Sequence, residues 1–153
     1  MNKFLSYLAK LLNRRKDKKE ASIQIKENIP ILYLHINGEK KAFLVDTGAS
    51  SSVIDKRQFD LSDYYALWDT EIKSGFGDVQ NVYTYSIPTM IDDTLFFITF
   101  VAADLPICDA MSEETGINII GVIGSEFFTK YKAVIDFKHL KLELYDIPRN
   151  RIK

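Results

Sequence analysis

The stretch Phe43-Leu44-Val45-Asp46-Thr47-Gly48-Ala49-Ser50 decides the fold of this chain. Three apolar residues run directly into Asp-Thr-Gly, and a second apolar pair, Val53-Ile54, follows. This order predicts a buried strand that ends at Asp46, where backbone amides of the next turn can donate hydrogen bonds to the carboxylate. Gly48 has no side chain, so the backbone can approach that carboxylate closely. An Asp-Thr-Gly tripeptide alone also fits an ordinary Asx-type turn after a strand.

Segments on both sides extend this pattern. Upstream, Ile31–Ile36 and Lys41–Val45 flank Asn37-Gly38, a pair that tolerates the positive φ angles of a type I′ turn and predicts a hairpin. Downstream, Val122-Ile123-Gly124-Ser125-Glu126-Phe127-Phe128 predicts an apolar strand followed by a helix capped by Ser125. Further strands are expected at Leu95–Ala102, Ile117–Ile123, Lys132–Phe137 and Lys141–Tyr145, and helices at Lys56–Leu61, Asp109–Thr115 and Glu126–Tyr131.

These segments together resemble the aspartic proteases. The run around Asp46 is similar to their active-site loop, and Ala49 after the glycine makes the retroviral, single-lobe type a closer likeness than the pepsin type. The block at Val122–Phe128 resembles the strand and helix that pass behind that loop in the family. The resemblance covers Ile31 to Tyr145. It implies a mainly β, retropepsin-like lobe: a closed or strongly bent sheet with a flap hairpin and one short C-terminal helix.

The resemblance also assigns the site. Asp46, Thr47 and Gly48 would be the catalytic loop, with the Thr47 hydroxyl bonded to the same loop of a partner chain. Gly124 would support the site where its strand passes under Asp46. Substrate contacts are implied for Ala49, Ser50, Gly75, Phe76, Gly77, Val122 and Ile123. The resemblance implies no metal and no organic cofactor.

The Asp-Thr-Gly loop occurs once in the sequence. An aspartic dyad therefore requires two chains, and we expect a homodimer that hydrolyses peptide bonds of a peptide or protein substrate. Water would be activated between Asp46 and its copy in the partner. The alternative is a catalytically silent peptide-binding or dimerisation module that keeps the loop for structure.

A second hairpin is expected between the Asp46 stretch and the block at Val122–Phe128, with strands at Glu71–Lys73 and Val79–Ile87. Its tip contains Gly75, Phe76 and Gly77, and glycines permit a mobile tip that covers a bound peptide. This pattern favours a flap. An ordinary surface hairpin, in which the glycines serve only the turn, is the alternative.

The sequence departs from the retroviral pattern in two places. Ser50 and Ser125 stand where retroviral enzymes usually carry an acid and its arginine partner, which removes that support of the dimer. The acidic segment Asp104–Thr115 is an insertion whose place in the family pattern cannot be derived. It contains the single cysteine, Cys108, which we interpret as a buried filler because no histidine lies near it in sequence.

Composition argues against several kinds of site and against nucleic-acid binding. The chain has 153 residues, enough for one domain, and a single cysteine excludes intrachain disulfides and multi-cysteine zinc sites. His35 and His139 lie too far apart in sequence for a paired-histidine metal motif. Residues 1–20 carry seven Lys and Arg against two acids, whereas residues 21–153 carry thirteen against nineteen. An acidic body argues against nucleic-acid binding.

The basic N-terminal segment needs a separate explanation. Its apolar residues recur at intervals of three and four and predict a short amphipathic helix: Phe4, Leu5, Leu8, Leu11 and Leu12. The helix is too short to span a bilayer and makes a poor export signal, since Lys10 interrupts it. We expect residues 1–22 to form a basic arm, residues 23–153 the protease domain, and the protein to be cytoplasmic. Residues 1–20 would make weak peripheral contact with the inner face of the membrane, or else form a mobile arm or rest on the domain.

Overall fold

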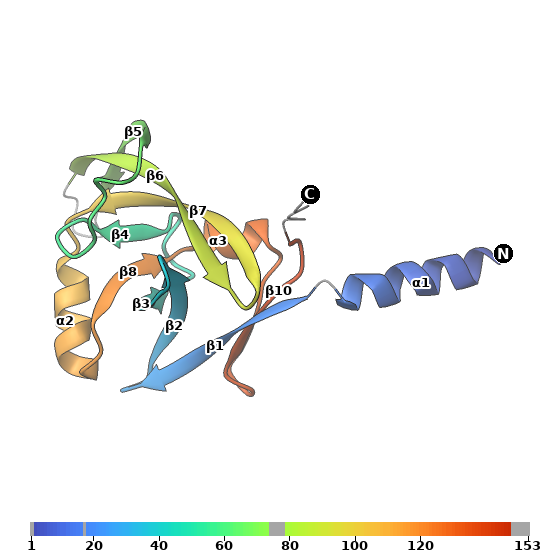
Figure 1. Cartoon of the computed structure of the whole chain (residues 1–153). Coiled ribbons are helices and arrows are strands. Elements are labelled where there is room, and N and C mark those ends of the chain that lie inside the picture. The colour runs from blue at the N-terminus through green and yellow to red at the C-terminus, as the bar shows by residue number, and fades with distance from the viewer. Residues whose placement is uncertain (1, 17, 74–78, 148–153) are drawn as a thin grey trace.

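The computed structural model describes residues 2–16, 18–73 and 79–147 of the chain (Figure 1). In this part of the chain the helices are α1 (Lys3–Lys16), α2 (Pro106–Thr115) and α3 (Ser125–Lys130). The strands are β1 (Lys19–Lys26), β2 (Ile29–Ile36), β3 (Glu39–Val45), β4 (Val53–Asp55), β5 (Ala66–Lys73), β6 (Val79–Ile91), β7 (Thr94–Ala103), β8 (Ile119–Ile123), β9 (Val134–Asp136) and β10 (Lys141–Leu144). The fold is mainly β, as the sequence predicts.

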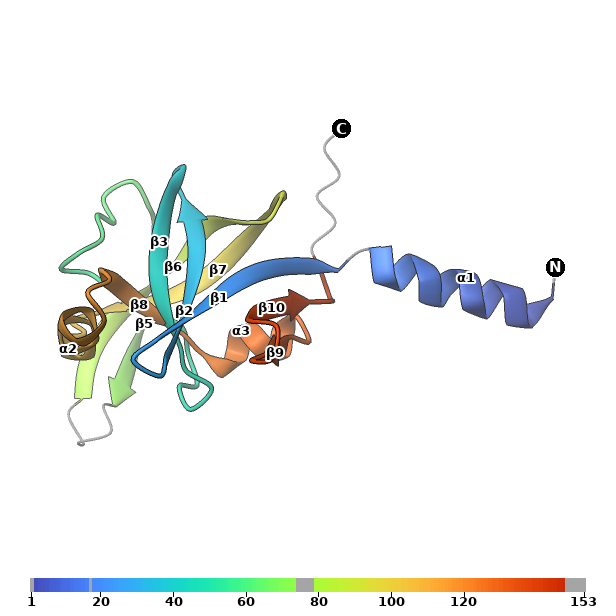
Figure 2. The ribbon, with the colours of Figure 1, turned by 90° about the horizontal axis from the view of Figure 1, so that it is seen from below.

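The strands form one strongly bent sheet, in the order β5-β6-β7-β4-β8-β3-β2-β1-β10-β9. β6 also pairs with β2, through His35 and Met90, and this pairing folds the sheet back on itself (Figure 2). Large buried side chains fill the interior, among them Phe43, Phe96 and Phe100. The rings of Phe43 and Phe100 stack with their centroids 5.5 Å apart. The expected closed or strongly bent sheet is confirmed.

The hairpin expected around Asn37-Gly38 is present. β2 and β3 pair antiparallel, and the last pair of the register joins Ile36 to Glu39. Between them Asn37 and Gly38 have φ angles of 53° and 77°, as a type I′ turn requires. β3 then leads directly into the stretch around Asp46.

Strand β8 lies at the centre of the sheet, between β3 and β4. It runs parallel to β3 and antiparallel to β4, so it connects the strand before the Asp46 loop to the strand after it. Gly121 permits this close packing. A Cβ at that position would stand 2.5 Å from the carbonyl oxygen of Val53 and 2.9 Å from the ring of Phe43.

One local expectation is wrong. No helix forms at Lys56–Leu61, where Oδ1 of Asp55 accepts the N–H of Arg57, and the carbonyl oxygen of Asp55 accepts the N–H groups of Gln58 and Phe59 in a single turn. The sheet begins with β1, whose residues Lys19–Ser22 pair with β10. The boundary expected between residues 22 and 23 therefore falls inside a strand.

Helix α1 extends away from the sheet in both views of the molecule (Figure 1, Figure 2). On it Phe4 and Leu5 are 65% and 57% exposed, and Tyr7 is similarly accessible. None of the helices in the described part of the chain has the length and hydropathy that crossing a bilayer requires. The expected N-terminal helix is present, and the side chains of Phe4, Leu5 and Tyr7 on it are largely exposed to solvent.

Candidate active site

Asp46 stands at the point where β3 ends, and the side chains of Asp46 and Thr47 are exposed in the single chain. The backbone N–H of Asp46 donates to the carbonyl oxygen of Ile123 at 3.1 Å, which fixes the start of the loop to β8. The N–H of Gly48 donates to Oδ1 of Asp46 at 2.9 Å. A Cβ on Gly48 would lie 3.2 Å from the same oxygen, so glycine leaves room for this bond.

The loop is also fastened to the start of α3. The carbonyl oxygen of Ala49 accepts hydrogen bonds from Ser125, at 2.8 Å from its backbone N–H and 3.1 Å from its hydroxyl. The hydroxyl and the backbone N–H of Ser125 thus both bond the same carbonyl oxygen. Ser125 therefore holds the loop through a backbone carbonyl, without a charged partner on Ser50.

Gly124 allows the loop and β8 to touch backbone to backbone. A Cβ on Gly124 would lie 2.6 Å from the carbonyl group of Ser51, so the closest backbone is that of Ser51 rather than that of Asp46. The N–H of Gly124 donates to the hydroxyl of Ser52 at 3.0 Å. The backbone contacts of Gly124 are thus made with Ser51 and Ser52, which follow the Asp46-Thr47-Gly48 tripeptide.

Glu126 is a residue of the site that the sequence reasoning missed. Its Oε1 accepts the backbone N–H of Ser52 at 2.6 Å, while its Oε2 is buried with no hydrogen-bond partner. Glu126 lies in the first turn of α3, where the helix dipole favours a carboxylate. The only signal in the sequence is that an acidic residue directly follows Gly124-Ser125. Its contact with Ser52 depends on tertiary packing and cannot be read from the sequence.

The residues expected to contact substrate differ in accessibility. Ser50 is exposed and Ala49 is partly buried. Val122 is buried in a cluster against which Ala49 also packs. Ile123 has no exposed surface and lies in the main core, so its side chain supports the loop from inside and does not face a bound peptide.

The second hairpin is longer than expected. β5 and β6 pair antiparallel up to Lys73 and Val79, and Val82 and Ile72 pack with Val53 of β4. The hairpin is thus attached to the strand that follows the catalytic loop. Gly75, Phe76 and Gly77 lie outside the described residues.

Two other carboxylates in the body, those of Asp55 and Asp136, have structural partners. Asp55 is buried, and Arg57 donates to both of its oxygens, at 2.9 and 2.7 Å. Asp136 accepts the backbone N–H of His139 at 2.9 Å, as expected for a turn residue. Among the described residues, no group of three or more His, Cys, Asp or Glu side chains is placed to hold a metal ion.

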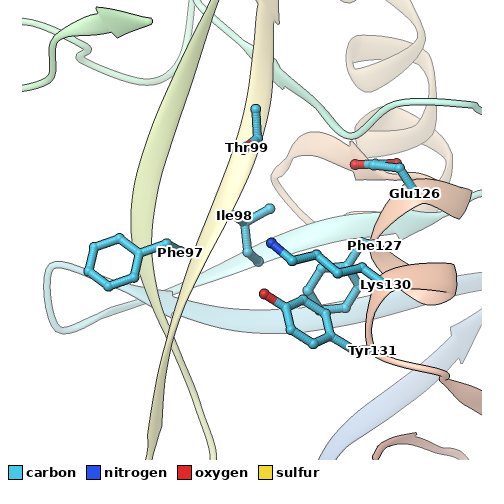
Figure 3. Close-up of a pocket in the computed structure, with 7 residues that line it drawn as sticks. All are labelled: Phe97, Ile98, Thr99, Glu126, Phe127, Lys130 and Tyr131. Carbon is cyan, nitrogen blue, oxygen red and sulfur yellow. The ribbon is translucent and has the colours of Figure 1, made fainter. Parts of the chain in front are cut away.

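A small cavity lies between β7 and α3, and Glu126 is one of its lining residues (Figure 3). Its volume is about 80 Å³, far below the roughly 300 Å³ or more of ordinary ligand pockets. Lys130 and Tyr131 extend into it toward β7 (Figure 3). Residues 46–52 do not line this cavity, and only Glu126, which bonds Ser52, links it to the Asp46 loop.

Comparison with protein families gives one match. The model of the retroviral aspartyl protease family matches residues 26–135, which include the Asp46 loop, the second hairpin, β8 and α3. A search among curated proteins finds no match. The matched region corresponds to most of the lobe described above.

Proposed function

The chain belongs to the retroviral aspartyl protease family, and we propose on this basis that it is an aspartic endopeptidase that works as a homodimer. Each chain would contribute one Asp46. The substrate would be a peptide or an extended segment of a protein, bound between the two catalytic loops and the two β5–β6 hairpins.

One observation carries the proposal. The Asp-Thr-Gly sequence occurs once and ends a buried strand, yet its residues are exposed in the single chain. The Asp46 carboxylate is nevertheless oriented, since Gly48 donates a hydrogen bond to it. A rigid but uncovered carboxylate is what half of a shared site requires.

Two Asp46 carboxylates about 3 Å apart would share one proton, since like charges at that distance cannot both ionise easily. The ionised carboxylate would take a proton from a bound water, which attacks the scissile carbonyl carbon. The protonated carboxylate would donate to the developing oxyanion and later to the leaving nitrogen. Thr47 would bond across the two-fold axis, and the β5–β6 hairpin would act as a flap that excludes water.

Cleavage of an unbiased peptide library by the full-length protein tests this function. Wild type should cut a subset of peptides, whereas Asp46→Asn should cut none, because an amide keeps the shape of the side chain but cannot share the proton. Asp92→Asn is the matched control: Asp92 is exposed in a turn with a φ of 57°, which asparagine tolerates, and activity should be unchanged.

The same experiment separates the alternative function. Hydrolysis that survives Asp46→Asn would contradict the proposal. An intact dimer that binds peptides but cuts none would instead identify a silent peptide-binding or dimerisation module. Native mass spectrometry on both proteins reports the dimer independently of the activity.

We propose further that the basic arm brings this cytoplasmic enzyme into weak, reversible contact with the anionic inner face of a membrane. The support is the exposed apolar side chains of α1, Phe4, Leu5 and Tyr7, next to a segment with an excess of Lys and Arg. A narrow apolar face combined with basic residues is typical of helices that lie in the membrane interface.

A further inference from the structure

The apolar face of α1 is exposed to solvent. Phe4, Leu5 and Tyr7 are each more than half exposed, and α1 extends away from the sheet in both views (Figure 1, Figure 2). Residues 1–20, which contain this helix, carry seven Lys and Arg against two acids. A protein surface that complements α1 must therefore offer apolar side chains together with negative charge.

The molecule carries such a surface on the side opposite α1. We define the acidic face as residues 60–73, which end with β5, and residues 104–115, which end with α2. Both segments lie on the side away from α1 in both views (Figure 1, Figure 2). Residues 55–114 as a whole contain twelve Asp and Glu against three Lys and Arg. Exposed carboxylates of the acidic face that make no ion pair with another described residue include Asp60, Asp63, Asp69, Glu71, Glu113 and Glu114.

The two segments of the acidic face are fixed to the sheet and to each other. Arg57, in the loop that leads to β5, donates to Asp109 of α2 at 2.9 Å and to both oxygens of the buried Asp55 at 2.9 and 2.7 Å. Cys108 of α2 is fully buried in a cluster that includes Leu44 of β3. Because the surface is already ordered, a partner that docks on it pays little to order it further.

Large apolar side chains are exposed within the acidic face. Tyr65, Leu67 and Trp68, around the start of β5, are 91%, 48% and 54% exposed, and Ile107 of α2 is 48% exposed. β5 is also the last strand in the order of the described sheet, so one of its edges has no neighbouring strand there. Single exposed apolar residues are ordinary, but a group of this kind among acids is typical of an interaction surface.

The arm of one copy cannot cover its own acidic face. α1 leads into β1, which is held from its first residue, since Lys19 pairs with Leu144 of β10 and bonds Asp93 at 2.6 Å. The 14 residues of α1 span about 21 Å, whereas a compact domain of this size is roughly 35 Å across. A helix that starts on the opposite side is too short to reach the acidic face, so its partner must be a second copy.

We propose that the basic arm of one copy docks on the acidic face of a second copy, with Phe4, Leu5 and Tyr7 of α1 against the exposed apolar side chains around the start of β5. The contact joins unlike surfaces, so each copy offers one arm and one face, and copies associate head to tail. The contact uses neither Asp46 nor Thr47 and goes beyond the proposed endopeptidase function. An anionic membrane competes for the same helix, and binding to a membrane alone is therefore an outcome of the test.

Light scattering of the full-length protein over a series of concentrations tests the contact. At low salt the mean mass of wild type should rise with concentration above the mass found at high salt, because salt screens the opposite charges. A face variant with Asp69→Lys and Glu113→Lys should need an about tenfold higher concentration for the same rise.

The matched control for the face variant carries Asp92→Lys and Asp146→Lys. Both residues are exposed, and the net charge changes by the same amount. They lie near the start of β1, since the neighbouring Asp93 bonds Lys19 and Leu144 pairs with it. The control should associate as wild type does, because its acidic face is unchanged.

A mixture of two defective variants tests the head-to-tail geometry. The arm variant, Phe4→Ser with Leu5→Ser, keeps its acidic face, and the face variant keeps its arm. Neither variant alone should associate at the concentrations at which wild type does. An equimolar mixture should, because the arm of the face variant meets the intact face of the arm variant.

The outcomes separate this contact from the membrane role and from catalysis. Equal mean mass of wild type at low and high salt, at every concentration, would overturn the docking, and binding to anionic vesicles in the same preparation would show that the arm serves the membrane alone. A mixture no heavier than its components would overturn the head-to-tail contact. Equal loss in the control and the face variant would do the same, because net charge alone would explain it. None of these measurements requires hydrolysis, so failure of the endopeptidase function is recognised separately.

Discussion

Three side chains hold the Asp46 loop by bonding to backbone groups. Ser125 bonds the carbonyl of Ala49, Ser52 bonds the N–H of Gly124, and Glu126 bonds the N–H of Ser52. The retroviral type usually carries an acid and an arginine at the positions of Ser50 and Ser125. Ser50 and Ser125 carry no charge, and the loop is supported by hydrogen bonds within one chain.

Replacement of Gly124 by alanine should be the most damaging small change near the loop. The new Cβ would stand 2.6 Å from the Ser51 carbonyl group, and backbone cannot move aside as a side chain can. We expect the free energy of unfolding to fall by about 3 kcal/mol, the upper part of the usual range for overpacking. Urea unfolding followed by circular dichroism measures this loss.

The control for that change is Gly38→Ala. Gly38 has a φ of 77°, but a Cβ there would meet nothing within 4 Å. Only the backbone strain of a left-handed residue remains, which costs about 1 kcal/mol. Equal losses in Gly38→Ala and Gly124→Ala would contradict the close approach of β8 to the loop.

Asp55 should make stability depend on pH. Burial raises the pKa of this carboxyl, but hydrogen bonds from Arg57 and Gln58 outweigh burial and hold the pKa below its usual value. A lowered pKa in the folded state means that the stabilisation is present above the pKa of the unfolded chain, about 3.9, and is lost as the pH falls through the folded value. Arg57→Gln should lower the free energy of unfolding at pH 7 and lower it much less at pH 3.

Urea unfolding of wild type and Arg57→Gln at pH 7 and pH 3 measures whether the cost of the substitution falls as the pH is lowered. A cost that is the same at pH 7 and pH 3 would show that Asp55 does not contribute through its charge. Lys56→Gln, which removes a neighbouring exposed positive charge, should change stability little at either pH.

At the scale of elements, α1 is expected to act independently of the folded lobe. Removal of residues 1–16, which precede β1, should leave peptide hydrolysis in solution unchanged but should reduce binding to vesicles that contain anionic lipid. Each basic residue near such a surface contributes about 1 kcal/mol at most, and high salt removes much of it. Sedimentation with anionic and neutral vesicles, at low and high salt, measures the effect.

Equal vesicle binding by the full-length and the shortened protein would contradict the membrane role of the arm. A variant of the full-length protein in which Phe4 and Leu5 are both replaced by serine keeps every Lys and Arg of the arm, so it tests whether charge alone is enough for binding. If the apolar face inserts into the interface, this variant should bind less than wild type even at low salt.

Elements with local signals were predicted from sequence, and elements that depend on distant partners were not. The β2–β3 hairpin follows from Asn37-Gly38, whose backbone angles are determined by the residues themselves. β1 is mostly polar, with only Ile23 fully buried, and it forms because β2 and β10 pair with it on either side. A mostly polar strand lacks the alternation of apolar and polar residues by which a strand is recognised in a sequence.

The candidate site shows the same division. Asp46, Thr47 and Gly48 could be singled out because, together with their apolar flanks and the block at Val122–Phe128, they resemble the active-site loop of the aspartic proteases. The contribution of Glu126 could not, since it depends on the approach of Gly124 to Ser51, across 73 residues of chain. Likewise the place of α2 follows from Arg57, whose bonds to Asp109 are invisible in the sequence pattern.

At the scale of the whole molecule, the single chain leaves its candidate catalytic loop uncovered. Asp46, Thr47 and Gly48 are exposed, although the strands on either side of them are largely buried. Burial of polar loop residues against a second copy requires that they find hydrogen-bond partners there. The Thr47 hydroxyl, which has no bond assigned within the described chain, is suited to such a role because it can both donate and accept.

Wild type should therefore sediment as a dimer that dissociates on dilution, and Thr47→Ala should weaken it. Two symmetric hydrogen bonds of about 1 kcal/mol each would be lost, which corresponds to a rise of roughly 30-fold in the dimer Kd. Thr129→Ala, on the exposed surface of α3, is the matched control and should leave the Kd unchanged. Analytical ultracentrifugation over a concentration series measures all three proteins. Monomer at every concentration, even with a peptide-mimicking inhibitor present, would contradict the shared dyad, because a single Asp46 cannot both hold and accept the catalytic proton.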